Sequence, residues 1–85
     1  MKQPSQPLLQ TLAKNLRYYR HQKGLSQEKL AELCGFHRTY ISDVERSKRN
    51  ITLLGLETLA VALGVSPPDL ITEMEVKENS DTLFY

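Results

Sequence analysis

Six polar side chains on the predicted outer face of residues 38–46 can form hydrogen bonds with another molecule. Ile41 and Val44, three residues apart, lie among them and predict a helix with a narrow apolar side. The polar residues are Arg38, Thr39, Tyr40, Ser42, Asp43 and Arg46. Guanidinium, hydroxyl and carboxylate groups match the donors and acceptors of base edges in the major groove of DNA, and an arginine can offer two parallel donors to guanine O6 and N7. The segment is therefore predicted to contact base edges.

The preceding residues predict a second helix and a tight turn. Ser26 is a natural N-cap, and Gly35 permits the positive φ that a sharp turn needs. Ala31 is small enough to let two helices approach closely, and Phe36 can anchor the turn to the core. Apolar residues repeat at helical spacing between the two ends, at Leu30, Ala31, Leu33 and Cys34. Together with residues 38–46, this pattern predicts a helix-turn-helix motif.

Three further helices are expected around this motif. One spans about residues 8–23. Another follows a Thr52 cap and ends at Gly64, and the last follows Ser66. The apolar face of the helix after Thr52 is predicted to comprise Leu53, Leu56, Leu59, Ala60 and Leu63. No run alternates with period two, so we predict an all-α fold with five helices. The expected organisation is a flexible arm over 1–7, a domain over 8–75 and a tail over 76–85.

Composition narrows the possible functions. The 85 residues carry a net charge of +1 that is unevenly distributed. Residues 1–64 hold ten Lys and Arg against five Asp and Glu, whereas residues 65–85 hold one Lys against five Asp and Glu. The basic part suits phosphate. Cys34 is the single cysteine, His21 and His37 are isolated, and no stretch suits a membrane span. We expect a cytoplasmic protein without a cofactor, a metal, a small-molecule ligand or enzymatic activity.

A broader pattern over about residues 9–72 resembles the lambda-repressor-like (Cro/xenobiotic-response-element) helix-turn-helix family. The matching positions are Gln27, Ala31, Gly35, Ile41, Val44 and the run Leu56, Leu59, Ala60, Leu63, Gly64 and Val65. Residues 37–51 are similar, more narrowly, to the controller proteins of restriction-modification systems. The resemblance implies a compact five-helix DNA-binding domain that acts as a dimer.

The resemblance also implies roles for individual residues. Arg38, Thr39, Tyr40 and Asp43 face base edges. Gln27 contacts a phosphate and can brace the following helix, and Arg46, Arg49 and Asn50 lie near the DNA backbone. Charge and exposure add Ser42, Arg17 and Arg20 as phosphate candidates. The complete set predicted to contact phosphate is Gln27, Ser42, Arg46, Arg49, Asn50 and Arg17, with Arg20 as a further candidate.

Structural roles remain open for several of these residues. Tyr40 can instead pack on the preceding helix. Asp43 can restrain Arg38 or Arg46 through an ion pair. Glu45 can pair with an arginine or cap the following loop, and Cys34 is predicted to be a small buried residue rather than a reactive thiol.

We therefore expect a sequence-specific transcriptional regulator that binds double-stranded DNA as a homodimer on a pseudo-palindromic operator. The dimer interface is predicted at Val65, Leu70, Ile71 and Met74, in the less basic part of the chain. The alternative is a protein-interaction module of the antitoxin or adaptor kind. The apolar ending Leu83-Phe84-Tyr85 favours that alternative.

Overall fold

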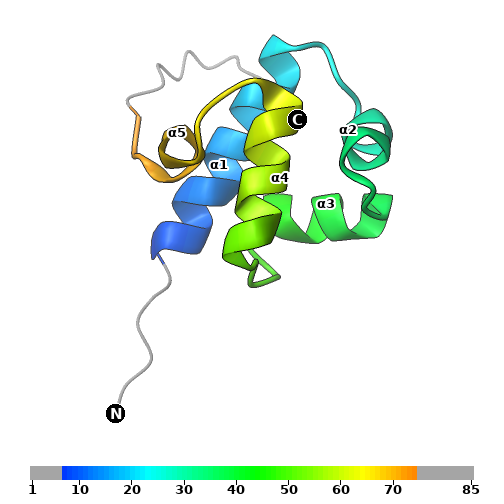
Figure 1. The fold of residues 1–85 in the computed structure, drawn as a ribbon. Coiled ribbons are helices and arrows are strands. Elements are labelled where there is room, and N and C mark those ends of the chain that lie inside the picture. The colour runs from blue at the N-terminus through cyan, green and yellow to red at the C-terminus, as the bar shows by residue number, and fades with distance from the viewer. Residues whose placement is uncertain (1–6, 75–85) are drawn as a thin grey trace.

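A computed structural model describes residues 7–74 of the chain, which form five helices and contain no strand. The helices are α1 (Pro7–Gln22), α2 (Gln27–Cys34), α3 (Arg38–Glu45), α4 (Leu53–Leu63) and α5 (Pro67–Ile71). Figure 1 shows α2 and α3 on one side of the molecule and α5 on the other, with α1 and α4 between them. The predicted all-α architecture is confirmed for these residues.

The helix ends follow from local sequence. The Ser26 hydroxyl accepts a hydrogen bond from the backbone N–H of Lys29 at 2.9 Å. The Thr52 hydroxyl accepts one from Gly55 at the same distance. Both bonds satisfy donors that a helix start leaves unpaired. Gly35 ends α2 at a φ of 76°, in the left-handed region that glycine adopts without strain. The two predicted N-caps and the predicted turn glycine are confirmed.

The core forms where α1 to α5 meet, and its largest fully buried side chains are mostly leucines. The buried apolar residues are Leu12, Ala13, Leu16, Leu30, Ala31, Ile41, Val44, Leu56, Leu59, Ala60, Leu63 and Leu70. Two predicted core positions are wrong, because Leu33 is 53% exposed and Leu53 is 82% exposed. Each lies at the edge of the apolar face of its helix. Periodicity alone does not show whether a neighbouring helix extends far enough to cover a residue there.

A single buried amide holds α5 against α1. The Asn15 side chain is only 1% exposed, and its Nδ2 donates to three backbone carbonyls at the end of the domain. The acceptors are the oxygens of Asp69 at 3.3 Å, Leu70 at 3.1 Å and Thr72 at 2.8 Å. These carbonyls lie in or next to a helix of only five residues, which could not persist alone in water. Asn15 thus fixes the position of α5.

The structure corrects the predicted dimer interface at Leu70. This side chain is 0% exposed and belongs to the core of one subunit. The prediction assumed that α5 had apolar residues to spare. The short helix instead directs Leu70 inward, while Val65, Ile71 and Met74 are half-buried.

The ends of the domain differ slightly from the prediction. Pro7, assigned to the arm, begins α1, where a proline's missing N–H costs nothing. α1 ends at Gln22 rather than at Lys23. Residues 1–6 of the predicted arm, the predicted tail and the Leu83-Phe84-Tyr85 ending all lie outside the described residues. Within residues 7–74, no helix is both long enough and apolar enough to cross a membrane.

We predict that Leu70→Ala destabilises the domain by about 2–5 kcal/mol, because it leaves a cavity in a well-packed core. Leu33→Ala is the matched control at an exposed site and should change stability by less than about 0.5 kcal/mol. Urea titration followed by circular dichroism measures both. Equal losses for the two variants would show that Leu70 is not a core residue.

Candidate nucleic-acid interface

The polar face of α3 is presented by the turn that joins it to α2. The backbone N–H of Phe36 donates to the Ala31 carbonyl at 2.9 Å and closes the turn. Ile41 and Val44 are 0% and 1% exposed and seat α3 on the core. This seating leaves Arg38 exposed at the start of α3. The helix-turn-helix geometry therefore delivers the first turn of α3 to solvent, as the sequence predicted.

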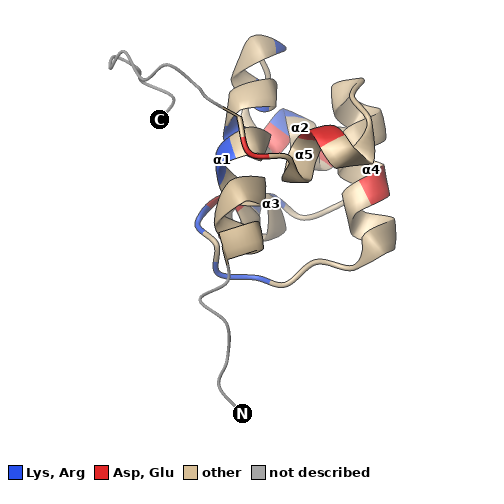
Figure 2. Ribbon diagram, turned by 90° about the vertical axis from the view of Figure 1, so that its left-hand side faces the viewer, with Lys and Arg blue, Asp and Glu red and all other residues tan. Residues whose placement is uncertain are grey.

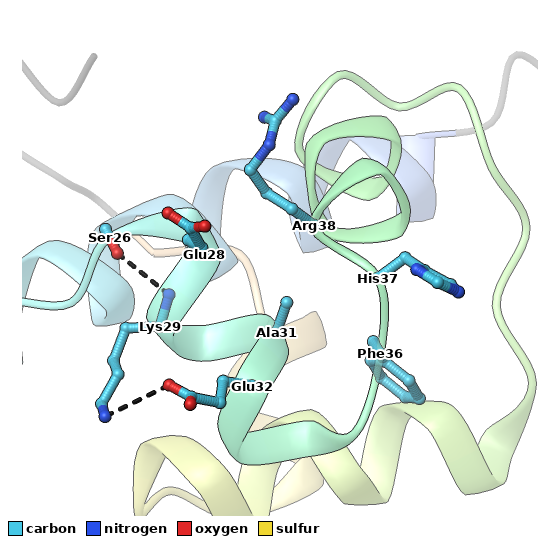
Figure 3. Close-up of a pocket in the computed structure, with 8 residues that line it drawn as sticks. All are labelled: Ser26, Glu28, Lys29, Ala31, Glu32, Phe36, His37 and Arg38. Atoms are coloured by element: carbon cyan, nitrogen blue, oxygen red, sulfur yellow. Dashed lines mark hydrogen bonds and ion pairs between the residues drawn. The ribbon is translucent and has the colours of Figure 1, made fainter.

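An open groove separates the start of α3 from α2. It has a volume of about 530 Å³ and is lined by Ser26, Glu28, Lys29, Ala31, Glu32, Phe36, His37 and Arg38. Figure 3 shows the Arg38 guanidinium extending away from the ribbon, well separated from the Lys29–Glu32 pair. Both acidic and basic side chains line the groove, and the exposed Arg38 lies on the side formed by α3.

A buried ion pair connects α1 to the end of α3. Nε of Arg20 lies 2.6 Å from Oε2 of Glu45, and Nη2 of Arg20 donates to Oε1 of Glu45 at 3.0 Å. The two residues are 8% and 3% exposed. The two parallel hydrogen bonds fix both the distance and the angle between the groups. Of the two structural roles left open for Glu45, the structure shows the ion pair with an arginine. The phosphate role considered for Arg20 is wrong, because its guanidinium is buried against this carboxylate.

Gln27 extends this pair to the surface. Its Nε2 donates to Oε1 of Glu45 at 3.0 Å. Its Oε1 accepts from Nη1 of Arg38, also at 3.0 Å. One uninterrupted chain of hydrogen bonds therefore runs from buried Arg20 to exposed Arg38. The expected brace between Gln27 and α3 is present.

Tyr40 is half-buried and belongs to a small aromatic cluster. Its ring centroid lies 4.6 Å from that of Phe36, and the Arg49 guanidinium lies over the Tyr40 ring at 4.9 Å from its centroid. This stacking is a favourable cation–π geometry. Burial raises the pKa of the Tyr40 hydroxyl, which Arg49 partly offsets. The structure thus places Tyr40 against the turn and the loop after α3.

The remaining polar residues of α3 differ in their exposure and in whether they form ion pairs within the protein. Thr39 is exposed and Ser42 is half-buried. Asp43 and Arg46 form an ion pair, with Nη2 of Arg46 3.1 Å from Oδ1 of Asp43. This pair is one of the alternatives left open for Asp43. The Arg46 side chain is still 62% exposed, so its guanidinium retains access to solvent.

Basic side chains continue from α3 onto α1 and the following loop. Figure 2 shows Lys and Arg positions along the loop between α3 and α4 and along α1. Arg17 is half-buried, and its Nη1 donates to the Glu45 carbonyl at 2.6 Å. With Lys14 and Arg46, Arg17 lines a shallow groove between α1 and the end of α3. Asn50 is exposed in the loop.

Burial also shifts the pKa values of two further titratable groups near the motif. Burial and the nearby Arg20 lower the pKa of His21, so its neutral form is favoured at neutral pH. Burial raises the pKa of the Cys34 thiol, whose Sγ lies 3.9 Å from the Thr58 carbonyl. Raising a thiol's pKa lowers its thiolate fraction and hence its reactivity. Cys34 is only half-buried, but its chemistry agrees with the predicted packing role. Residues 7–74 contain no cluster of His, Cys, Asp and Glu suited to a metal ion.

Comparison with known proteins agrees with this geometry. The helix-turn-helix family model matches residues 16–70. The control protein C.SmaI of Serratia marcescens is 54% identical over 66 residues, which cover 78% of this chain and 79% of that protein. The solved restriction-modification controller protein C.AhdI of Aeromonas hydrophila superposes with a TM-score of 0.71 at 45% identity, covering 73% of this chain and 94% of that one. The controller protein C.Esp1396I, solved as a tetramer in complex with its natural 35 base-pair operator, gives a TM-score of 0.68 at 38% identity and covers 74% and 83%.

The fold and the exposed first turn of α3 define a helix-turn-helix transcriptional regulator. The chain belongs to the helix-turn-helix family, and its similarity to restriction-modification controller proteins confirms the narrower resemblance.

We predict that Arg20→Met destabilises the domain by about 3–5 kcal/mol, because it leaves the Glu45 carboxylate buried without its guanidinium partner. The double variant Arg20→Met/Glu45→Leu removes both charges and should regain most of that loss. Free energies of unfolding from urea titration test this. A double variant at least as unstable as the sum of the two single variants would contradict the buried pairing.

Proposed function

We propose that this chain is a sequence-specific DNA-binding regulator that binds a pseudo-palindromic operator as a homodimer. The observation that carries the proposal is the exposed first turn of α3, held by a helix-turn-helix with basic residues on both sides. In this geometry α3 enters the major groove. The two α3 helices of a dimer then contact successive grooves about 34 Å apart.

Within this proposal the residues divide into two groups. Arg38, Thr39, Tyr40 and Asp43 contact base edges, with Arg38 well suited to guanine because it is exposed and offers two donors. Tyr40 is half-buried, so it reaches bases with its exposed edge. The phosphate group comprises Ser42, Arg46, Arg49, Asn50 and Arg17. The stacking of Arg49 on Tyr40 supports this division, because it orders the guanidinium beside α3 before DNA arrives.

The dimer needs an apolar surface that the folded subunit leaves exposed. α4 supplies one: Leu53, Leu54 and Val61 are 82%, 71% and 79% exposed. Leu8 is 56% exposed and lines an apolar groove of about 350 Å³ beside Leu53. We infer that the second subunit covers this outward face of α4, with Ile71 at its edge. Covering these exposed leucine and valine side chains removes apolar surface from water, which favours association.

Regulation follows from occupancy of the operator. The dimer represses when its site overlaps a promoter and activates when the site lies just upstream. In this function the protein binds DNA and catalyses no reaction. It acts in the cytoplasm, where the bacterial chromosome lies. Its family and its similarity to control proteins support this view.

The proposal predicts different effects for two arginines. Arg38→Ala should weaken specific binding by about 1–3 kcal/mol per half-site and relax the preference at one base pair. Arg49→Ala, the matched control, should weaken binding to all duplexes about equally, because phosphates carry no sequence information. The operator would first be selected from random DNA and then assayed with every single-base change. A uniform loss in the Arg38 variant would refute its base-reading role.

The dimer interface predicts a second outcome. Leu54→Glu should give a folded monomer with much weaker operator affinity, because it places a carboxylate in the apolar contact. Leu33→Glu, which changes an exposed leucine of α2, should remain dimeric. Sedimentation equilibrium distinguishes the two states. A fully dimeric Leu54→Glu protein would place the interface elsewhere, with Val65 and Met74 as the next candidates.

A further inference from the structure

The shallow groove between α1 and the end of α3 gathers basic side chains (Figure 2). It has a volume of about 550 Å³, and its lining includes Lys14, Arg17, Glu45, Arg46 and Ser47. Glu45 is the one acidic residue of this lining, and its carboxylate is buried in the ion pair with α1. Glu45 therefore lines the groove without presenting its charge there. Three cationic side chains determine the charge of the groove.

These cationic side chains retain hydrogen-bond donors for a ligand. Arg17 uses one N–H on the Glu45 carbonyl at 2.6 Å, and Arg46 uses one on Asp43 at 3.1 Å. A guanidinium has five N–H donors, so each arginine has others to offer. Lys14 is exposed, and its ammonium group adds three donors. Positive charge combined with these donors favours an anion with several acceptor oxygens.

Ser47, in the same groove, has an unusual backbone conformation. Its φ is 58°, and it is the one non-glycine residue with a positive φ among residues 7–74. Its N–H donates to the Val44 carbonyl at 3.1 Å, and the N–H of Lys48 donates to the Asp43 carbonyl at 2.8 Å. These two bonds form a Schellman motif at the end of α3, in which glycine usually takes the left-handed position. A serine there stores backbone strain, which suggests a function for its side chain.

The Ser47 hydroxyl forms a weak bond within the protein. It donates to the Leu9 carbonyl at 3.5 Å, beyond the usual range of about 2.5–3.0 Å for a hydrogen bond between two oxygens. A charged phosphate oxygen is a stronger acceptor than a carbonyl. The hydroxyl therefore gains when it exchanges the Leu9 carbonyl for a phosphate in the groove.

The length of α3 relates this groove to the major groove of DNA. Arg38 and Arg46 are eight positions apart, which corresponds to about 12 Å along a helix. The major groove of DNA is about 12 Å wide. When the first turn of α3 contacts base edges, the other end of the helix therefore lies beside the phosphates that border the groove.

We propose that the groove between α1 and the end of α3 binds one phosphodiester of the operator backbone, and that Ser47 is held in its strained conformation to donate its hydroxyl to that phosphate. Lys14, Arg17 and Arg46 neutralise the phosphate charge. The inference rests on the proposed function, in which DNA is the partner. It adds Lys14 and Ser47 to the residues that contact the backbone.

Substitutions of Ser47 should change stability and affinity in opposite directions. Ser47→Gly relieves the strain and should raise the melting temperature by about 2–8 °C. It should also weaken DNA binding by about 2- to 12-fold per subunit, which corresponds to one lost hydrogen bond. Ser47→Ala keeps the strain, so it should lose the same affinity without the thermal gain. Calorimetry and fluorescence anisotropy measure the two effects.

The loss should be equal for the selected operator and for unrelated duplexes, because a phosphate carries no sequence information. A Ser47→Gly protein that binds DNA as tightly as wild type would overturn the role of the hydroxyl. An affinity loss in Ser47→Gly alone, with Ser47→Ala unchanged, would attribute the effect to backbone flexibility and equally overturn that role.

A salt titration tests the cationic part of the site. Lys14→Gln should reduce the slope of log K against log salt by about 1 per subunit. Lys23→Gln is the matched control on the same face of the sequence charge, because the Lys23 side chain lies beside Gly64 at the end of α4. Its slope should equal that of wild type. An unchanged slope in Lys14→Gln would remove Lys14 from the site.

Ethylation interference shows whether the residues share one phosphate. Ethylating the contacted phosphate should impair binding of wild type strongly and impair binding of Lys14→Gln and Ser47→Ala less, at the same position of each half-site. Different positions for the two variants would refute a single site. Inorganic phosphate that displaced DNA from wild type but not from Lys14→Gln, at constant ionic strength, would assign the groove to free phosphate instead.

Failure of the proposed function gives a different result. A wild-type protein that prefers no duplex would refute sequence-specific regulation. The salt slopes of wild type and Lys14→Gln on a random duplex would then still decide whether the groove binds the DNA backbone.

Discussion

The position of α3 depends on the buried ion pair between Arg20 and Glu45. α3 has only eight residues, and its N-cap, His37, makes no side-chain capping bond. A helix this short is marginal in isolation, so tertiary contacts must hold it. Ile41 and Val44 supply apolar contact, but apolar packing alone tolerates small rotations. The two parallel bonds from Arg20 to Glu45 add a directional constraint at the C-terminal end of the helix. Burying two charges is costly in itself, so the pair's contribution is to orientation more than to net stability.

The ion pair between Arg20 and Glu45 also keeps the surface around α3 basic. Because Glu45 is neutralised internally, its charge does not oppose the basic groups around α3. Arg17 donates to the Glu45 carbonyl rather than to its carboxylate, so its positive charge is not cancelled by that contact. A second buried polar group acts in the same manner at the other end of the domain, where Asn15 fixes α5. Among the described residues, no buried side-chain nitrogen or oxygen lacks a hydrogen-bond partner. Full pairing is what makes such buried polar groups tolerable in a small core.

Sequence reasoning succeeded where local chemistry determines the outcome. Ser26, Thr52 and Gly35 act at helix ends through their own side chains or φ angles, and these effects need no knowledge of the fold. It failed where a residue's role depends on a distant partner. Arg20 is one more arginine on a basic helix until α3 brings Glu45 beside it, 25 residues away in sequence. Asn15 gave only a weak signal in the sequence, because its acceptors are backbone carbonyls 54 to 57 residues later. The one available hint was its place beside Leu12 and Leu16 on the apolar face of α1, where an amide must find buried partners.

The failure at α4 has a different physical origin. Leu56, Leu59, Ala60 and Leu63 of its predicted apolar face are buried as expected, but Leu53 is exposed, as are two further apolar residues outside that face, Leu54 and Val61. A helix can turn only one face into the core of its own subunit, so apolar residues on its other side stay exposed. A small domain buries a modest fraction of its chain and gains from covering such a face. The exposed Leu53, Leu54 and Val61 are therefore the residues that a second subunit would bury in the proposed dimer. In the proposed dimer, one contact would therefore serve two purposes. It would cover apolar residues that a single subunit leaves exposed, and it would create the two-fold symmetry that recognition of a pseudo-palindromic operator requires.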